Sequence, residues 1–275
     1  MRIGVVPKLG SPQALTLARR VMEYAEARGI ETYLDSRAKE HLTWHRLFTV
    51  GRDTLDFIVV IGGDGTVLRT LHMLRDSVIP LITIRYGRRG FLCDVAPFEY
   101  KTAIDRLISR DYELVDYIRL KASIGSARLP YVLNEYAVTT SGDARGKVAR
   151  LRVLKDEEPI YFLVGDGVIV APPAGSTAYS LASGGPVVDP RLDVILITPL
   201  APITFCSRAV VLPSTTTVRI VVSGDSPDLI VLADGIIAAE VGPGEVIEIT
   251  KAPIPARFAR FYLRDYYVRL FERCM

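Results

Sequence analysis

The segment GGDGT at residues 62–66 has the residue types and spacing best suited to chemistry in this chain. Successive glycines let backbone N–H groups converge on an anion, and the N-terminus of a following helix adds about half a unit of positive charge. An aspartate in the loop would repel phosphate, unless its carboxylate holds Mg²⁺ or accepts a proton from a hydroxyl that attacks phosphorus. The motif therefore predicts phosphoryl transfer, with Asp64 as the catalytic residue and a candidate Mg²⁺ ligand. A tight turn capped by Asp64 is the alternative.

Arginines surround the end of the next apolar run, PLITIRYGRRGF. In a parallel sheet the carboxyl ends of neighbouring strands meet at one edge, so we expect these arginines to lie near residues 62–66. Guanidinium groups bind phosphate oxygens in pairs, which suits a triphosphate or a polyphosphate chain. Solvated surface arginines are the alternative. The candidate residues for phosphate and donor binding are Gly62, Gly63, Gly65, Thr66, Arg69, Arg85 and Arg88.

Several other kinds of site are not indicated by the sequence. It has no GxGxxG dinucleotide fingerprint, and GDARGKV lacks the spacing of a P-loop. His41 and His45 are four residues apart, but no third ligand of suitable spacing is near. Three scattered cysteines indicate neither a disulfide framework nor a structural zinc site.

The elements that position GGDGT follow from the hydrophobic pattern. RIGVVP, ETYL, DFIVVI and PLITIRY are short apolar runs typical of buried parallel strands, and helix-spaced apolar residues separate them. One helix should begin at Ser11-Pro12 and end at Gly29, and another should follow GGDGT. We therefore predict a doubly wound α/β domain over residues 1–112 that carries GGDGT as its phosphate loop.

The remainder of the chain changes to closely spaced strands. Runs such as YELVDYIRLKASI, YVLNEYAVTT and IYFLVGDGVIVA are separated by turn signals such as SGDARG and GPGE. This pattern predicts a β-rich, sandwich-like domain over residues 113–255, with one inserted helix at STAYSLAS. Residues 256–275 should form a strand through Leu263 and a helix capped near Asp265, a tail that packs back on the N-terminal domain.

Composition sets the protein class and location. The 275 residues are 49% apolar with a net charge of +3, which is typical of a globular protein and argues against a nucleic-acid partner. The alternation of arginine with aromatic residues in the tail is the one feature that suggests base stacking, and an amphipathic helix explains it better. We see no signal peptide and no membrane span, so we expect a cytoplasmic protein with no membrane partner.

An ordered series of motifs resembles the NAD kinase family. The series is GGDGT, GRRGFL, NE at Asn134-Glu135 within an apolar strand, GDGVIVAPPAGSTAYSLASGGPVV, ITPLAP and ADG, over residues 56–235. GGDGT alone is shared with diacylglycerol kinases, sphingosine kinases and phosphofructokinases, whereas GSTAYS combined with NE is highly specific.

The resemblance implies transfer of a phosphoryl group from ATP or polyphosphate to the 2′-hydroxyl of the NAD adenosine ribose. It implies Mg²⁺ or another divalent cation, bound through the phosphates, and a homo-oligomer, either a dimer or a tetramer. Asn134 would read the adenine edge, Glu135 the ribose hydroxyls and Asp166 the nicotinamide end. The implied NAD-binding residues are Asp64, Gly65, Phe91, Asn134, Glu135, Asp166, Thr177, Ala178, Tyr179, Ser180 and Ala201.

Two alternatives and three departures from the family pattern accompany this interpretation. A lipid or sugar kinase would share GGDGT, and a non-catalytic NAD(P)-sensing module would keep the pocket without turnover. Arg85 stands where the family usually has asparagine, Ala174 where serine or threonine is usual, and Ile236 where glutamine often follows Asp-Gly.

Overall fold

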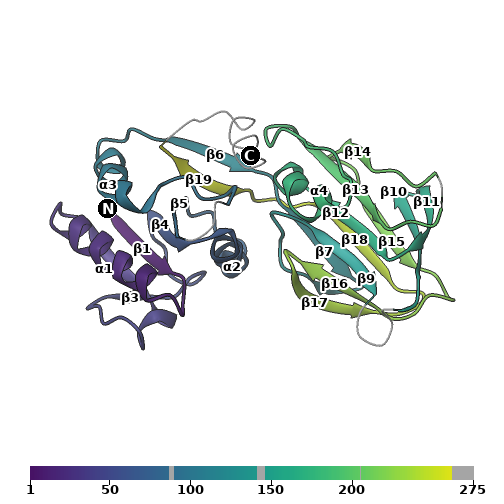
Figure 1. The fold of residues 1–275 in the computed structure, drawn as a ribbon, viewed down its shortest axis with the longest axis horizontal. Coiled ribbons are helices and arrows are strands. Elements are labelled where there is room, and N and C mark those ends of the chain that lie inside the picture. The colour runs from purple at the N-terminus through teal and green to yellow at the C-terminus, as the bar shows by residue number, and fades with distance from the viewer. Residues whose placement is uncertain (87–89, 141–145, 205, 262–275) are drawn as a thin grey trace. The chain divides into compact units, whose positions relative to one another are not determined.

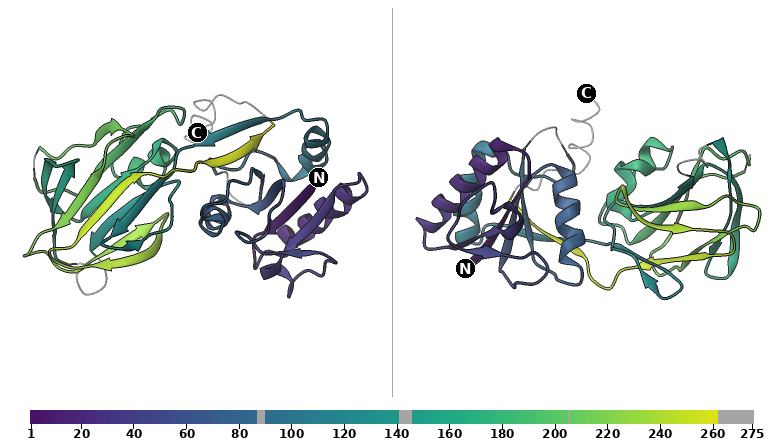
Figure 2. Two further views of the ribbon diagram at one scale, coloured as in Figure 1. Left: turned by 180° about the vertical axis from the view of Figure 1, so that it is seen from behind. Right: turned by 90° about the horizontal axis from the view of Figure 1, so that it is seen from below.

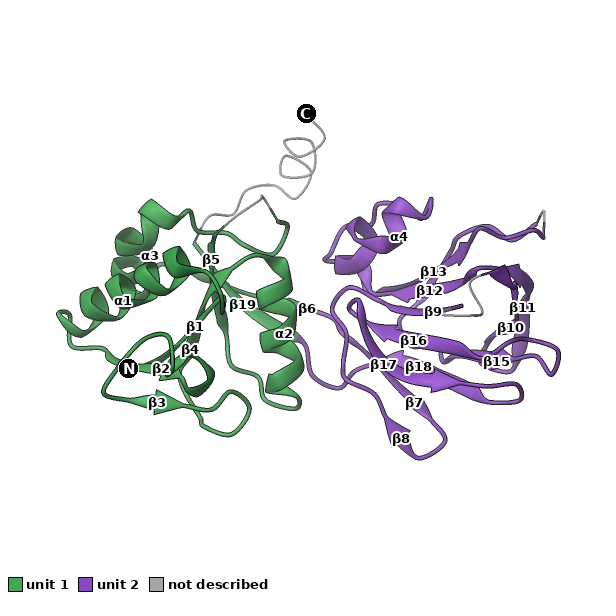
Figure 3. Cartoon of the chain, turned by 60° about the horizontal axis from the view of Figure 1, so that its bottom comes forward, with its two compact units in different colours: residues 1–116, 256–275 green, residues 117–255 purple. Residues whose placement is uncertain are grey.

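The computed structural model describes residues 1–86, 90–140, 146–204 and 206–261, which form two compact units (Figures 1 and 3). The first unit contains Met1–Asp116 and the segment that begins at Ala256, and the second unit contains Tyr117–Pro255. The expected helix near Asp265, the strand end at Leu263 and the donor-site candidate Arg88 lie outside the described residues. Each unit is built from its own hydrophobic core.

The first unit is built on a sheet that, in the described part of the chain, has seven strands in the order β3-β2-β1-β4-β5-β19-β6. Neighbours from β3 to β19 pair in parallel. Their apolar runs are continuous because both faces are covered. The strands are β1 (Arg2–Pro7), β2 (Glu31–Asp35), β3 (Leu47–Phe48), β4 (Phe57–Gly62), β5 (Leu81–Arg85), β6 (Glu113–Tyr117) and β19 (Ala256–Arg260).

Helices cover the two faces of this sheet (Figure 2). Helices α1 (Pro12–Glu26) and α3 (Tyr100–Ile108) lie on one face, where Ala18 and Ile104 pack against Val5 and Val59. Helix α2 (Asp64–Leu74) lies on the other face. The hydroxyl of Ser11 accepts the Ala14 N–H and caps α1 as expected. This arrangement is the predicted doubly wound α/β domain, completed by the short 3-10 helices η1 (Ser36–Ala38) and η2 (Pro97–Glu99).

The second unit is a sandwich of two antiparallel sheets, each of six strands among the described residues. One sheet has the order β11-β10-β15-β18-β7-β8, with β7 (Leu120–Ile124), β8 (Ala127–Arg128), β10 (Ala149–Lys155), β11 (Glu158–Gly165), β15 (Val218–Val222) and β18 (Val246–Lys251). The other has the order β14-β13-β12-β9-β16-β17, with β9 (Tyr136–Thr140), β12 (Gly167–Ala171), β13 (Val194–Leu200), β14 (Val210–Pro213), β16 (Leu229–Ala233) and β17 (Ile236–Val241).

Side-chain alternation along the second sheet explains its inserted helix. Val168 and Val170 of β12 face the core between the sheets. Ile169 and Ala171 face the opposite side, where they form a smaller cluster with Val188. That outer face is covered by residues 173–188, which contain η4 (Pro173–Thr177) and the four-residue helix α4 (Tyr179–Ala182). The predicted sandwich with one inserted helix is therefore confirmed.

The boundary between the two units and the position of β19 add to the predicted organisation. The units divide at Asp116 rather than at residue 112, because β6 joins the sheet of the first unit. Strand β19 also belongs to that sheet and pairs with β5 through Phe258 and Leu81. None of the helices in the described ranges combines the length and apolar character needed to cross a membrane.

Candidate functional site

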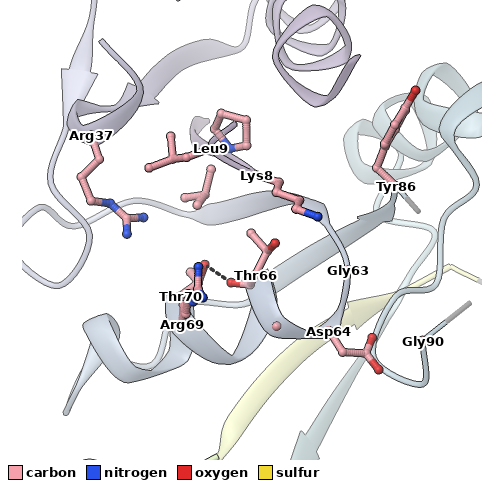
Figure 4. Close-up of a pocket in the computed structure, with 13 residues that line it drawn as sticks. Lys8, Leu9, Arg37, Gly63, Asp64, Thr66, Arg69, Thr70, Tyr86 and Gly90 are labelled. Atoms are coloured by element: carbon pink, nitrogen blue, oxygen red, sulfur yellow. Dashed lines mark hydrogen bonds between the residues drawn. The ribbon is translucent and has the colours of Figure 1, made fainter. Parts of the chain in front are cut away.

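Asp64 begins helix α2, and its carboxylate is held by backbone donors. The N–H of Phe91 donates to Oδ2 at 2.8 Å, and the N–H of Leu92 donates to Oδ1 at 3.2 Å. A Cβ at Gly90 would lie 1.9 Å from Oδ1, so the absent side chain at Gly90 admits the carboxylate. Figure 4 shows Asp64 turned toward Gly90. Carboxylate oxygens have additional lone pairs, so Asp64 can still accept from a substrate hydroxyl or bind a cation.

The three glycines of the loop differ in what the fold requires. A Cβ at Gly62 would lie 2.4 Å from Oγ1 of Thr66, so the protein itself requires glycine there. A Cβ at Gly63 or at Gly65 would meet no described atom within 4 Å, and neither residue has a positive φ. No contact with the described residues therefore requires their small size. That small size leaves open the backbone N–H groups of the first turn of α2, as an anion site requires.

A cleft of about 710 Å³ opens in front of this loop. Basic side chains reach it from three elements: Lys8 follows β1, Arg37 lies in η1 and Arg69 lies in α2 (Figure 4). Arg37 also forms an ion pair with Asp35. The cleft therefore combines helix N–H groups, three cations and one carboxylate, which suits a polyphosphate group with a bound divalent cation.

The second unit holds the Asn134-Glu135 pair in an unexpected way. The prediction that this pair lies within a strand is wrong, because β9 begins only at Tyr136. The backbone N–H groups of Leu133, Asn134 and Glu135 donate instead to the carboxylate of Asp234, at 3.2, 2.7 and 3.2 Å. Since one carboxylate satisfies three consecutive donors, the segment is fixed without a neighbouring strand.

Two further features define this segment. A Cβ at Gly175, in η4, would lie 1.6 Å from the carbonyl oxygen of Asn134, so only glycine fits where η4 meets the pair. The Glu135 side chain is 6% exposed, and its Oε2 accepts the N–H of Tyr179 at 3.4 Å. Burial, with a smaller effect of the Asp234 charge, raises the pKa of Glu135 to about 7. Because this pKa is close to neutral, hydrogen-bond donors supplied by a ligand would favour the ionised carboxylate of Glu135.

A second cavity, of about 890 Å³, lies over one end of the sheet that contains β9, β13 and β16. Asp166, Tyr179 and Ala201 line it, as do Thr139 and Thr140. Tyr179 is 44% exposed, which suits an aromatic ring that receives a ligand. Ala201 has a φ of +41°, a conformation that L-residues seldom adopt and that often occurs at functional sites.

The comparisons with known proteins assign these features to one family. The ATP-NAD kinase N-terminal domain matches residues 3–112, and the ATP-NAD kinase C-terminal domain matches residues 133–261. The chain belongs to the NAD kinase family. The NAD kinase of Pyrococcus abyssi is 37% identical over 270 residues, covering 97% of this chain and 96% of that protein. The NAD kinase of Aeropyrum pernix is 37% identical over 276 residues, covering 99% and 98%.

Solved structures of the NAD kinase family agree. An NAD kinase from Archaeoglobus fulgidus in complex with ATP has a TM-score of 0.78 at 28% identity, covering 99% of this chain and 98% of that chain. Yeast NADH kinase complexed with NADH shares the fold, with a TM-score of 0.89 at 22% identity over 99% of this chain and 86% of that chain.

The NAD kinase residues predicted from the sequence fall into three groups. The first cleft brings together Asp64, Gly63, Gly65, Thr66 and Arg69, and the second cavity brings together Asp166, Tyr179 and Ala201. Arg85, at the end of β5, and Gly62 do not line the first cleft, and Asn134, Glu135, Thr177 and Ala178 do not line the second cavity. Phe91 contributes its backbone N–H to Asp64.

Ser180, which the resemblance assigns to NAD binding, does not line the second cavity. Its side chain is fully buried, and its hydroxyl lies 2.8 Å from that of Thr198, so it bonds within the protein rather than facing the cavity. Sequence reasoning missed Lys8 and Arg37. Lys8 directly follows β1 and Arg37 is the second residue after β2, so the rule that singled out Arg85 at a strand end would have found them.

Proposed function

We propose that the protein transfers the terminal phosphoryl group of ATP to the 2′-hydroxyl of the adenosine ribose of NAD, forming NADP. The observation that carries this proposal is the Asp64 carboxylate at the N-terminus of α2. It is held by two N–H groups in a cleft with three basic side chains. Such a carboxylate orients an attacking hydroxyl and accepts its proton late, since phosphoryl transfer has a loose transition state that needs little early deprotonation.

The first unit supplies the donor side of the reaction. The open N–H groups of the α2 N-terminus receive phosphate oxygens, and Lys8, Arg37 and Arg69 balance their charge. ATP is supported as the donor by the ATP-NAD kinase family and by the Archaeoglobus fulgidus enzyme in complex with ATP. A polyphosphate chain carries repeated phosphate charges, as the triphosphate of ATP does, so it is a second donor to be tested. The contribution of Arg85 and Arg88 to donor binding is likewise proposed and remains to be tested.

The second unit supplies the acceptor side. The Asn134 amide can pair with an adenine edge, and the Glu135 carboxylate can accept from ribose hydroxyls. Asp166 and Tyr179 would receive the nicotinamide end in the second cavity, where the Tyr179 ring can contact a cationic nicotinamide. Ala201 also lines this cavity. Thr177 and Ala178, which precede Tyr179 in the chain, are assigned to NAD binding on the resemblance to the family. Phe91 of the first unit is assigned on the same ground as a wall for adenine.

A divalent cation fits the residues present. Among the described residues no three His, Cys, Asp or Glu side chains gather to hold a metal alone. Mg²⁺ is commonly held by one or two carboxylates together with substrate phosphates, and Asp64 offers such a carboxylate in the cleft. When bound, the cation neutralises charge on the phosphates. We also propose a homo-oligomer, on the resemblance to the family.

A labelling experiment tests the proposal against its alternatives. The protein is incubated with Mg²⁺ and ATP that carries a radioactive γ-phosphate, and with NAD, a diacylglycerol or a hexose as acceptor. We expect label in NADP alone. Label in the lipid or the sugar would contradict the proposed acceptor, and NAD binding without any transfer would identify a sensor. A parallel reaction with labelled polyphosphate measures the second donor.

A further inference from the structure

The segment 91–95 holds Asp64 but has little regular structure of its own. Its Phe91 and Leu92 N–H groups bind the carboxylate, yet residues 91–94 are neither helix nor strand. The position of those donors, and therefore of the Asp64 carboxylate, depends on the contacts that hold segment 91–95 against the rest of the unit.

Thr83 of β5 provides the first attachment. Its hydroxyl donates to the Leu92 carbonyl at 2.8 Å and accepts the Asp94 N–H at 3.2 Å. Its carbonyl accepts the N–H groups of Asp94 and Val95, at 3.2 and 3.0 Å. One buried threonine thus ties the middle of segment 91–95 to the central sheet.

Arg260, the last residue of β19, provides the second attachment. Its side chain is 4% exposed, and NH1 donates to the Leu92 carbonyl at 2.9 Å and to the Thr83 hydroxyl at 3.4 Å. The guanidinium lies over the ring of Phe258, 4.5 Å from its centre. The neighbouring Phe261 N–H donates to Asp94 Oδ2 at 3.2 Å. Arg260 at the end of β19 and the next residue, Phe261, therefore hold segment 91–95 at two points.

A charged side chain at this depth needs a reason beyond packing, because burying a charge is costly and an apolar side chain of similar length would fill the same space. A charge-assisted hydrogen bond is roughly twice as strong as a neutral one, so a guanidinium holds the Leu92 carbonyl more firmly than a neutral donor would. The same charge acts close to Asp64: burial, with the charge of Asp64, raises the pKa of the Cys93 thiol to about 12, and the charge of Arg260 opposes this rise.

We infer that Arg260, with Thr83, is a positioning residue for phosphoryl transfer: it fixes the Leu92 carbonyl and thereby the two N–H groups that orient the Asp64 carboxylate. This inference rests on the proposed role of Asp64. Neither Arg260 nor Thr83 lines the cleft, so both act through segment 91–95 rather than on the substrates.

The test compares Arg260→Met, which keeps length and loses charge, with Arg260→Lys, which keeps charge. The control is Arg257→Met on the same strand, whose arginine pairs with Asp116 at 2.7 Å. We expect kcat of Arg260→Met to fall about tenfold or more, with the KM values for ATP and NAD within about twofold of wild type. Arg260→Lys should recover part of this loss, and Arg257→Met should match wild type. An equal loss in Arg257→Met, or a loss confined to KM, would overturn the inference.

A second pair of variants applies if Arg260→Met does not fold. Thr83→Val removes the hydroxyl and nearly keeps the shape, and it should lower kcat, whereas Thr83→Ser should restore it. Equal rates for Thr83→Val and Thr83→Ser would contradict the role given to this network.

Combination with Asp64→Asn separates the positioning role of Arg260 from the catalytic role of Asp64. If Arg260 acts through Asp64, then Arg260→Met causes little further loss in the Asp64→Asn background, and a full additional loss there would refute the inference. Wild-type turnover that survives Asp64→Asn would instead refute the role of Asp64.

Discussion

Glu135 is a buried residue whose chemistry departs from that of its free side chain. Its carboxyl is buried beside Asp234, and this burial raises its pKa to about 7. If ribose hydroxyls donate to the ionised carboxylate, NAD binding must release the proton that Glu135 holds below pH 7. The affinity for NAD should therefore depend on pH in the physiological range.

We predict that the Kd for NAD rises about tenfold between pH 8 and pH 6, because the ionised fraction of Glu135 falls by that factor. Glu135→Gln should bind NAD more weakly than wild type at pH 8 and with little pH dependence. Calorimetric titration of both proteins across this range measures the effect. The same slope in both would show that another group is responsible.

The raised pKa of Glu135 also makes the folding stability of the NAD-free protein depend on pH. Between about pH 4.5 and 7 the folded state keeps a proton that the unfolded state has lost, so the stability contributed by Glu135 falls as the pH rises. The full effect is about 3 kcal/mol. In denaturant unfolding, Glu135→Gln should gain stability relative to wild type from pH 5 to pH 8. A constant difference between the two proteins would contradict this assignment.

At the scale of elements, much of the first unit was predictable. Parallel strands buried on both faces give continuous apolar runs, so β1, β4 and β5 are evident in the sequence. The Ser11-Pro12 start of α1 carries its own capping chemistry. Ligands bind at the carboxyl ends of parallel strands, and this rule places the cleft. We applied it to Arg85 and not to Lys8 or Arg37.

Elements fixed by distant contacts were not predictable. The apolar pattern around Asn134-Glu135 resembles a strand, but Asp234, a hundred residues away for Asn134, takes the N–H groups that a strand would use. Ser180 is polar and lies in a motif rich in predicted ligands, yet Thr198 pairs with its hydroxyl inside the protein. Arg260 gives no local signal, because its partners Leu92 and Thr83 are brought to it only by the sheet.

The first turn of α2 allows the requirements of folding and of binding to be separated. Gly65→Ala adds a methyl group where no described atom lies within 4 Å, and alanine favours the helix by about 0.8–1.0 kcal/mol. We predict an unchanged or higher melting temperature together with a KM for ATP raised about tenfold or more, because the methyl group occupies the space of the phosphates. Gly224→Ala, also in open space but in a loop of the second unit, is the matched control and should leave the KM unchanged. A wild-type KM in Gly65→Ala would contradict the phosphate site.

At the scale of the whole molecule, the two units divide the proposed work. The first contains the carboxylate, the helix N-terminus and the basic side chains suited to a phosphoryl donor. The second contains the Asn134-Glu135 pair and the cavity with Asp166 and Tyr179, suited to a dinucleotide. A change to the chemistry of the first unit should therefore spare recognition of NAD by the second.

The most direct test of this account is to measure NADP formation and NAD binding side by side in wild type and in Asp64→Asn, with saturating ATP and Mg²⁺. Asparagine keeps an oxygen that can accept the Phe91 N–H, but it cannot accept the proton of the hydroxyl. We predict that kcat falls by 10²–10⁴-fold, about 3–5 kcal/mol of barrier, while the Kd for NAD stays within about twofold of wild type. A near-native kcat in Asp64→Asn would contradict the central claim that this carboxylate performs the phosphoryl-transfer chemistry.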